Sequence, residues 1–283
     1  MLRFKNRINE YKKDPLSLVL FIAVNFAILV TLATLAFIVL YILINGIPHL
    51  KPSLFSWEYN TQNVSVLPAI INTLVMVGVS LVISVPLGIG CAIYLVEYAS
   101  RKNRLIKYIR VTTETLSGIP SIVYGLFGML FFVTTLKMGL SIISGSLTVS
   151  IMILPLIIRS TEEALKSVPD AFREASFGIG AGKLRTVMRI VLPSAVPGIL
   201  AGIILAIGRI IGETAALLYT AGSAPKIAGS LGESGRTLSI HMYALSKEGF
   251  YTNEAYATAV ILLITVFALN TVASVIAKKL SKN

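Results

Sequence analysis

The sequence predicts an all-α integral membrane protein with six membrane-spanning helices, and three observations support this fold class. Of the 283 residues, 55% are hydrophobic and only 13% are charged, and the mean hydropathy is +0.82. A soluble globular domain is not built from such a composition. Six long runs carry no charged residue, and the basic residues gather in alternate segments between them. Together these features place both termini on the cytoplasmic side.

Each uncharged run is near or above the ~20 residues that a helix needs to cross ~30 Å of hydrocarbon. The first is much longer than the apolar core of a secretory signal, and no A-x-A cleavage site follows it, so we expect it to remain as an anchored span. The fifth continues past Arg209 and Glu213 to about Tyr219. The uncharged runs are 16–44, 67–96, 115–136, 138–158, 190–208 and 255–277.

Proline and glycine predict irregular positions within the spans. Pro86 predicts a bend in the second span, and Gly118 with Pro120 predicts an interruption of the third near its cytoplasmic end, because proline removes a backbone donor. An amphipathic piece is expected at Leu238–Leu245, in the longest outside segment. The expected spans are 16–44, 67–97, 113–136, 147–165, 194–220 and 255–277.

The net charge of +12 is distributed as in a membrane protein rather than a nucleic-acid-binding one. Basic residues concentrate in the tail 1–15, the link 98–111, the loop 161–193 and the C-terminal end. Because basic residues collect on the cytoplasmic side of membrane proteins, these segments are expected inside. The predicted outside segments hold only Lys51, Lys137, Lys226, Arg236 and Lys247.

The sequence gives no sign of disulfide or metal chemistry. Cys91 is the single cysteine, so no disulfide can form within the chain. His49 and His241 lie far apart in the sequence, with no cysteine or carboxylate cluster near either. We therefore expect no metal site.

The loop 161–193 is expected to form a helix pair with an apolar face. Ser167 is expected to cap the first helix, and Gly178 and Gly180 to end it, because glycine accepts positive φ. Pro193 is expected to stop the second helix. The apolar face could pack on the protein's own spans, lie among lipid headgroups or dock on another protein. It would carry Val168, Phe172, Ala175 and Ile179 from the first helix and Leu184, Val187, Met188 and Val191 from the second.

Within this loop, F-G-I-G-A-G-K-L superficially matches the phosphate-binding loop G-x4-G-K-[ST]. Phe177 stands where the first glycine belongs, and Leu184 stands where a magnesium-binding hydroxyl belongs. The sequence has no other candidate, and it assembles no nucleophile, base or metal set. We expect neither an ATP site of this kind nor catalytic residues on this chain, so ATP and magnesium would be used by a partner.

The stretch E-A-S-F-G-I-G-A-G-K-L-R-T-V-M-R-I-V-L-P, from Glu174 to Pro193, resembles the E-A-A-x3-G-x9-I-x-L-P loop of ABC-importer permeases. Ser176 is the one departure, a small residue in place of the second alanine. The resemblance implies a type I importer permease fold, with a core domain over 67–277. It also implies that the helix pair couples this core to a separate ATPase subunit. The matching positions are Glu174, Ala175, Gly180, Ile190, Leu192 and Pro193.

Arg209 and Glu213 are energetically the most costly residues in the sequence, because both fall within an apolar span. A charged side chain at mid-bilayer costs about 2.5–3.5 kcal/mol on insertion scales. Four residues apart in one helix, the two side chains would share a face. They could form a self-neutralising structural pair. Alternatively, Arg209 faces the transport pathway and meets an anion, while Glu213 holds it in position.

Two further motifs, G-I-P-S-I-V-Y-G-L-F-G at 118–128 and G-R-I-I-G-E-T-A-A-L at 208–217, resemble the phosphate-specific permeases of the Pst system. The similarity spans about 67–274 and is closer to the PstA type than to the PstC type. It implies that Arg209 and Glu213 are the family's intramembrane pair on the substrate pathway. Hydroxyls of span three could donate to the anion, although such groups more often hold helices together. They belong to Ser117, Ser121 and Tyr124.

The resemblance also implies the other parts of an importer. These are a paralogous permease of PstC type, a pair of PstB-type ATPase subunits that use ATP and magnesium, and an extracytoplasmic phosphate-binding protein of PstS type. The implied location is the bacterial or archaeal cytoplasmic (inner) membrane. Two alternatives stay open: a permease for another oxyanion such as sulfate or molybdate, and a channel or secondary carrier that needs no ATPase.

Overall fold

The structure, a computed structural model, describes residues 15–99 and 104–280, and within these ranges it contains helices and no β-strand. The predicted tail 1–15 lies outside them apart from Pro15. Two short 3-10 turns, η1 (Ile47–His49) and η2 (Pro52–Phe55), follow the first helix, and three π-helical segments are η3 (Tyr94–Tyr98), η4 (Met129–Thr135) and η5 (Val187–Val191). The α-helices are α2 (Pro15–Gly46), α3 (Leu67–Ile93), α4 (Arg104–Ser117), α5 (Ser121–Gly128), α6 (Ile142–Lys166), α7 (Asp170–Gly178), α8 (Lys183–Thr186), α9 (Leu192–Gly212), α10 (Ala215–Thr220), α11 (Leu238–Glu248) and α12 (Thr252–Leu280).

Five helical stretches of the described chain are long and apolar enough to cross a membrane, and α4 with α5 supplies a sixth when this bent pair is counted as one span. The predicted six-span, all-α fold is confirmed. Span four begins earlier than expected, at Ile142, because the Ser141 hydroxyl caps it by accepting the Ser144 backbone N–H at 3.3 Å. The five stretches are Leu16–His49, Leu67–Tyr98, Ile142–Lys166, Lys183–Gly212 and Thr252–Lys279.

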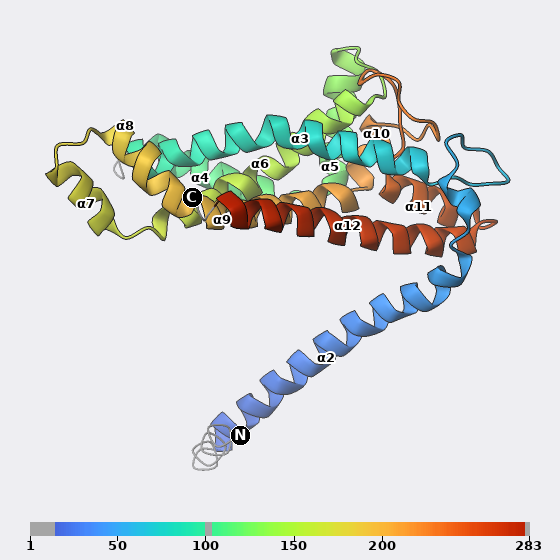
Figure 1. Cartoon of the computed structure of the whole chain (residues 1–283), viewed down its shortest axis with the longest axis horizontal. Coiled ribbons are helices and arrows are strands. Elements are labelled where there is room, and N and C mark those ends of the chain that lie inside the picture. Colours follow the sequence, from blue (N-terminus) through green and yellow to red (C-terminus); the bar gives the residue numbers. More distant parts are fainter. Residues whose placement is uncertain (1–14, 100–103, 281–283) are drawn as a thin grey trace.

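Helix α6 forms the centre of the bundle, packed against α3 and α9 (Figure 1). In the most apolar stretch of each helix, 61% of the residues of α6 are buried within this chain, compared with 11% for α12 and 0% for α2. The central cluster is built largely from these three helices, with Met76 of α3, Ile153 and Ile157 of α6, and Ile210 and Ile211 of α9, and it also takes in side chains of α5, α10 and α11. These three helices are therefore the frame that positions the loops at either end.

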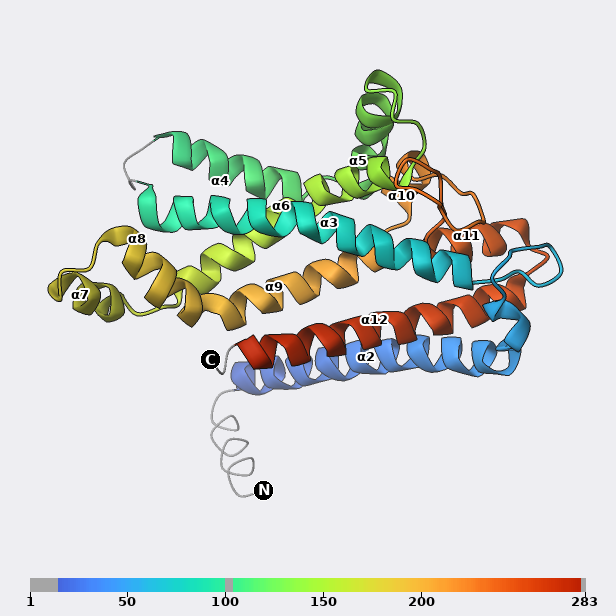
Figure 2. The ribbon, with the colours of Figure 1, turned by 45° about the horizontal axis from the view of Figure 1, so that its top comes forward.

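Helix α2 meets the bundle at one end only. Near that end the rings of Tyr41 and Tyr256 of α12 lie edge to face with centroids 5.9 Å apart. From there α2 diverges from the other helices in one view (Figure 1) and runs beside α12 in the other (Figure 2). Because its apolar side chains are exposed all round, α2 is a peripheral span rather than part of the core.

Span three is broken, as Gly118 and Pro120 predicted, and the helix direction bends by 101° at the break. The break is held from inside, because the Tyr124 hydroxyl donates to the Leu116 carbonyl at 2.8 Å. The first arm, α4, begins at residue 104 rather than at the expected 113. The hydropathy pattern missed this earlier start because α4 carries several charged residues and extends the span as an amphipathic helix.

Gly125 allows close approach of α5 and α10, which gives a stability prediction. A β-carbon at this position would lie 2.8 Å from the Cα of Ala216, so the α10 backbone would have to shift. We expect Gly125→Ala to destabilise the protein by ~1–3 kcal/mol, measured as a lower unfolding temperature in detergent. Gly90→Ala in α3 is the matched control, because a β-carbon there meets nothing within 4 Å. Equal losses in both variants would contradict this packing.

Candidate functional site

Arg209 lies in the last turn of α9, within predicted span five. Its side chain is exposed on this chain, and the described residues offer it no hydrogen bond or ion pair. It borders a cavity of about 390 Å³ formed with α4 and α6, here named the inner cavity. On its other side lies a hollow of about 650 Å³ that also touches Asn270 of α12. Arg209 is therefore a cation without an ion-pair partner in the described chain, and it lines both cavities.

The other three cations on the wall of the inner cavity each have a carboxylate partner. Glu162 of α6 is 7% exposed and is shared by two of them, and a third has its own carboxylate. A third carboxylate, Glu114, also lines the cavity, so the wall carries four cations and three carboxylates. Arg209 is the one cation on this wall without an ion-pair partner in the described chain, and the wall as a whole is positive by one charge. The ion pairs are Lys166–Glu162 at 2.6 Å, Arg110–Glu162 at 3.5 Å and Arg159–Glu163 at 3.1 Å.

Glu213 does not share a helix face with Arg209, so that prediction was wrong. Helix α9 ends at Gly212, Glu213 is extended (φ −72°, ψ 124°), and the expected continuous span 194–220 is interrupted there. The carboxylate is buried, and its Oε1 accepts the backbone N–H of Ala216 at 3.0 Å, which caps the start of α10. The Ser239 hydroxyl donates to the Glu213 carbonyl at 2.6 Å. Glu213 therefore holds the break in the helix rather than the arginine.

The three hydroxyl residues of span three occupy different positions. Ser117 lines the inner cavity with Arg209, although its hydroxyl already donates to a backbone carbonyl within α4 at 2.7 Å. Tyr124 is buried and its hydroxyl is engaged by Leu116, as described above. Ser121 lines neither hollow beside Arg209. Only Ser117 is brought to the cavity.

Helices α7 and α8 form the predicted helix pair at one end of the bundle (Figure 1). Helix α7 ends at Gly178, and Gly180 in the turn has φ +80°, as its sequence position predicted. Ser176 is buried, and its hydroxyl lies 2.8 Å from that of Thr186, which ties α7 to α8. The one departure from the family motif therefore supplies a contact that alanine could not make. Glu174 and Ala175 are exposed on α7.

The predicted apolar face of this pair is divided in two. Val168 and Val191 are buried in a cluster with residues of α3 and α6, and Val187 is buried as well. The other half is exposed, with Ile179 at 85% and Leu184 at 67%. Half of the face thus anchors the pair to the spans, and half is free for another partner. This exposed α7–α8 surface consists of Phe172, Phe177, Ile179, Leu184 and Met188.

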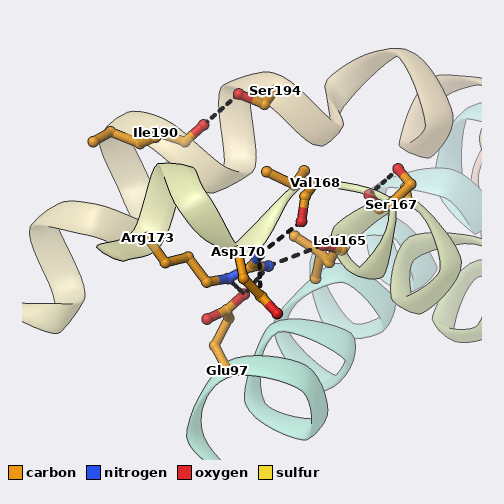
Figure 3. Close-up of polar contacts among 9 residues, drawn as sticks. Glu97, Leu165, Ser167, Val168, Asp170, Arg173, Ile190 and Ser194 are labelled. Atoms are coloured by element: carbon orange, nitrogen blue, oxygen red, sulfur yellow. Dashed lines mark hydrogen bonds and ion pairs between the residues drawn. The ribbon is translucent and has the colours of Figure 1, made fainter. Parts of the chain in front are cut away.

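Two expected helix boundaries in the loop were wrong. Ser167 ends α6 and does not cap α7, which begins after Pro169. Pro193 does not stop the second helix, because α8, η5 and α9 form one continuous stretch. The π turn η5 precedes the proline, and the Ser194 hydroxyl donates to the Ile190 carbonyl at 2.7 Å (Figure 3). This irregular turn accommodates the missing N–H, so Leu192 and Pro193 lie in the span itself.

Sequence reasoning missed Arg173 and Glu97. The Arg173 guanidinium lies between α7 and the end of α3, and it binds Glu97 Oε1 through Nη2 at 2.7 Å and Nε at 3.1 Å (Figure 3). The two residues are 76 positions apart, and no motif links them. The available signal was a carboxylate at the end of an otherwise uncharged run, Glu97 after 67–96.

The capping role of Glu213 gives a second stability prediction. Glu213→Gln keeps an oxygen that can accept the Ala216 N–H, so its unfolding temperature in detergent should stay close to that of the parent. Glu213→Ala removes the acceptor and should cost ~1 kcal/mol or more, because a buried N–H is left unsatisfied. If both substitutions destabilise the protein equally, the carboxylate charge rather than the cap is what matters.

Comparisons with known proteins agree with this architecture. Residues 84–283 match the family described as binding-protein-dependent transport system inner membrane component. The probable ABC transporter permease protein YqgI of Bacillus subtilis is 34% identical over 270 residues, which cover 86% of this chain and 90% of that protein. The phosphate transport system permease protein PstA of Haemophilus influenzae is 32% identical, covering 86% and 87% respectively. PstA 1 of Mycobacterium tuberculosis is 43% identical over 154 residues, only 54% of this chain and 50% of that protein.

Solved structures share the fold. A chain of a bacterial ABC transporter involved in the import of the polysaccharide alginate superposes with a TM-score of 0.62 at 17% identity, covering 97% of this chain and 99% of that one. A chain of the inward-facing MetNI methionine transporter gives 0.58 at 20% identity, covering 76% and 94%. These likenesses concern the fold alone, and they confirm the predicted type I importer permease architecture. By its family match and its identity to the Bacillus protein, the chain belongs to the inner-membrane permease components of binding-protein-dependent ABC transporters.

Proposed function

We propose that this chain is a PstA-type permease subunit that imports inorganic phosphate across a bacterial cytoplasmic membrane. It would form the pathway with a paralogous PstC-type permease, driven by a PstB-type ATPase pair and supplied by a PstS-type binding protein. The observation that carries the proposal is Arg209, an unpaired guanidinium on the wall of the inner cavity. The names of the Haemophilus and Mycobacterium relatives support phosphate as the cargo.

The chemistry of Arg209 suits a small tetrahedral oxyanion. A guanidinium presents paired N–H donors that match two phosphate oxygens, and it keeps its charge at every biological pH. Its placement in an apolar helix is costly unless an anion or a polar cavity compensates it. Because Glu213 is engaged in capping α10, the guanidinium is left free for the anion.

The proposed cycle uses the two ends of the bundle. The binding protein releases phosphate into an outward-open cavity between the two permeases, and Arg209 supplies positive potential partway across. The ATPase pair closes on ATP, and the exposed α7–α8 surface transmits this closure to the spans. Hydrolysis then resets the pair. Phe177 and Leu184, at the two failed positions of the phosphate-loop pattern, are both exposed on this surface, in keeping with a docking role.

Substitution of Arg209 tests the cargo. Uptake of radiolabelled phosphate by the assembled complex should fall roughly 100-fold or more in Arg209→Gln, the factor that corresponds to about 3 kcal/mol of lost ion-pair free energy. Arg209→Lys keeps the charge but loses the fork of donors, so we expect a smaller loss. Co-purification of the permease partner and ATPase should be unchanged in both variants.

Competing anions separate the remaining candidates. Excess unlabelled phosphate should suppress uptake, while sulfate and molybdate should not. Competition by sulfate alone would overturn the phosphate assignment and favour another oxyanion. Normal uptake in Arg209→Gln would show that Arg209 has a structural role and does not bind the anion. Uptake by the purified chain without an ATPase would favour a channel or secondary carrier.

Gly180 tests the docking role of the helix pair. A β-carbon at this position has free space, so the cost of substitution comes from its φ of +80°. A non-glycine residue there costs about 1–2 kcal/mol, and asparagine less than a β-branched residue. The loss of phosphate uptake should therefore be smallest in Gly180→Asn, larger in Gly180→Ala and largest in Gly180→Val. Gly178→Ala, without positive φ or a close neighbour, is the control. Equal uptake in Gly180→Val and Gly178→Ala would refute the role of the turn.

A further inference from the structure

The Arg173 guanidinium has a bond for each of its donors. An arginine carries five N–H groups, and here they reach carboxylate and backbone oxygens on four segments (Figure 3). Glu97 takes two of them through a single oxygen, as described above. The other three go to the Leu165 carbonyl at 3.0 Å, the Val168 carbonyl at 2.8 Å and Asp170 Oδ1 at 3.1 Å.

These partners join three structural elements at one point. Glu97 lies in η3, which continues α3, whereas Leu165 is in the last turn of α6, where helix carbonyls lack helical donors. Val168 belongs to the link between α6 and α7, and Arg173 itself is in α7. One side chain therefore connects the helix pair to the cytoplasmic ends of two central spans. We name Arg173, Glu97 and the two carbonyls the clamp.

Burial distinguishes the clamp from ordinary surface ion pairs. The side chains of Arg173 and Glu97 are 14% and 8% exposed, whereas that of Asp170 is 85% exposed. A shielded, charge-assisted network is stronger than an exposed pair, which contributes little to stability. Removing one member would leave the other charge without its partner. The Glu97 contact, rather than the Asp170 contact, is thus the rigid part.

We propose that Arg173 is a positioning residue that makes the helix pair move as one body with the cytoplasmic ends of α3 and α6. This inference rests on the proposed function, because it assigns the step that converts ATPase closure into movement of the spans. Helix α6 also carries Glu162 and Lys166 on the wall of the inner cavity that Arg209 borders. Displacement of α7 is thereby passed through the clamp to a helix on the wall of that cavity.

The test measures coupling in the assembled importer. The complex is reconstituted in liposomes with the binding protein, and phosphate uptake and ATP hydrolysis are measured on the same sample. In Arg173→Lys and Glu97→Gln, ATPase subunits should stay bound and ATP should still be hydrolysed. Uptake per ATP should fall roughly tenfold, within the range typical of a coupling free energy between two sites. Lysine offers three donors and no planar fork, so it cannot reproduce the contacts.

Asp170→Asn is the matched control. It makes the same carboxylate-to-amide change as Glu97→Gln at the exposed partner of the guanidinium, removes only that charge and leaves the Glu97 contacts intact, so uptake per ATP should stay close to that of the parent. Unchanged uptake per ATP in Glu97→Gln and Arg173→Lys would overturn the proposal, and so would loss of the ATPase subunits from both variants, which would mark a docking contact instead. Failure of the proposed function is distinguishable, because the parent complex itself would then show no ATP-driven phosphate uptake.

Discussion

Inside hydrocarbon, a polypeptide must satisfy its backbone polar groups from within the protein, and the spans of this structure are interrupted where side chains meet that demand. After α4 the chain turns sharply, and the Tyr124 hydroxyl occupies the Leu116 carbonyl. After α9 the helix stops, and the Glu213 carboxylate receives the Ala216 N–H. In both places a polar side chain that could have served the substrate stabilises the backbone instead.

This constraint also determines the electrostatics of the inner cavity. Glu213 is the acidic residue closest in sequence to Arg209, and in an unbroken helix it would lie within reach. Because the helix ends between them and the carboxylate is turned to α10, the guanidinium forms no ion pair with it. The remaining cations on the cavity wall share the carboxylates of α6. The backbone requirement at α10 is thus what leaves Arg209 as the one cation on the wall without a carboxylate partner in the described chain.

Features with a local signal could be predicted from the sequence, and features that depend on distant contacts could not. Hydropathy located the spans, Gly118 and Pro120 located the break, and Gly180 has the left-handed conformation that its place in the turn required. The pairing of Arg209 with Glu213 failed because it assumed that an apolar run is one helix. The clamp had one local signal, the carboxylate of Glu97 at the end of an uncharged run, and nothing in the sequence identified Arg173, 76 positions away, as its partner. Among the predicted hydroxyl residues, only Ser117 reaches the cavity, because it lies in the α4 arm that lines the cavity with α6 and α9.

The splayed position of α2 has a consequence for how the chain tolerates change. A helix that contacts its own bundle at one end contributes little to the free energy of unfolding of the bundle. Its insertion depends on the hydrocarbon core of the bilayer. Exchange of one aliphatic residue for another along most of its length leaves no void in the bundle, because these side chains lie outside the buried clusters of the described residues. Amino-acid substitutions in α2 therefore need to preserve only hydrophobicity and length. Substitutions in α6 must also preserve the shape of side chains that pack against α3 and α9.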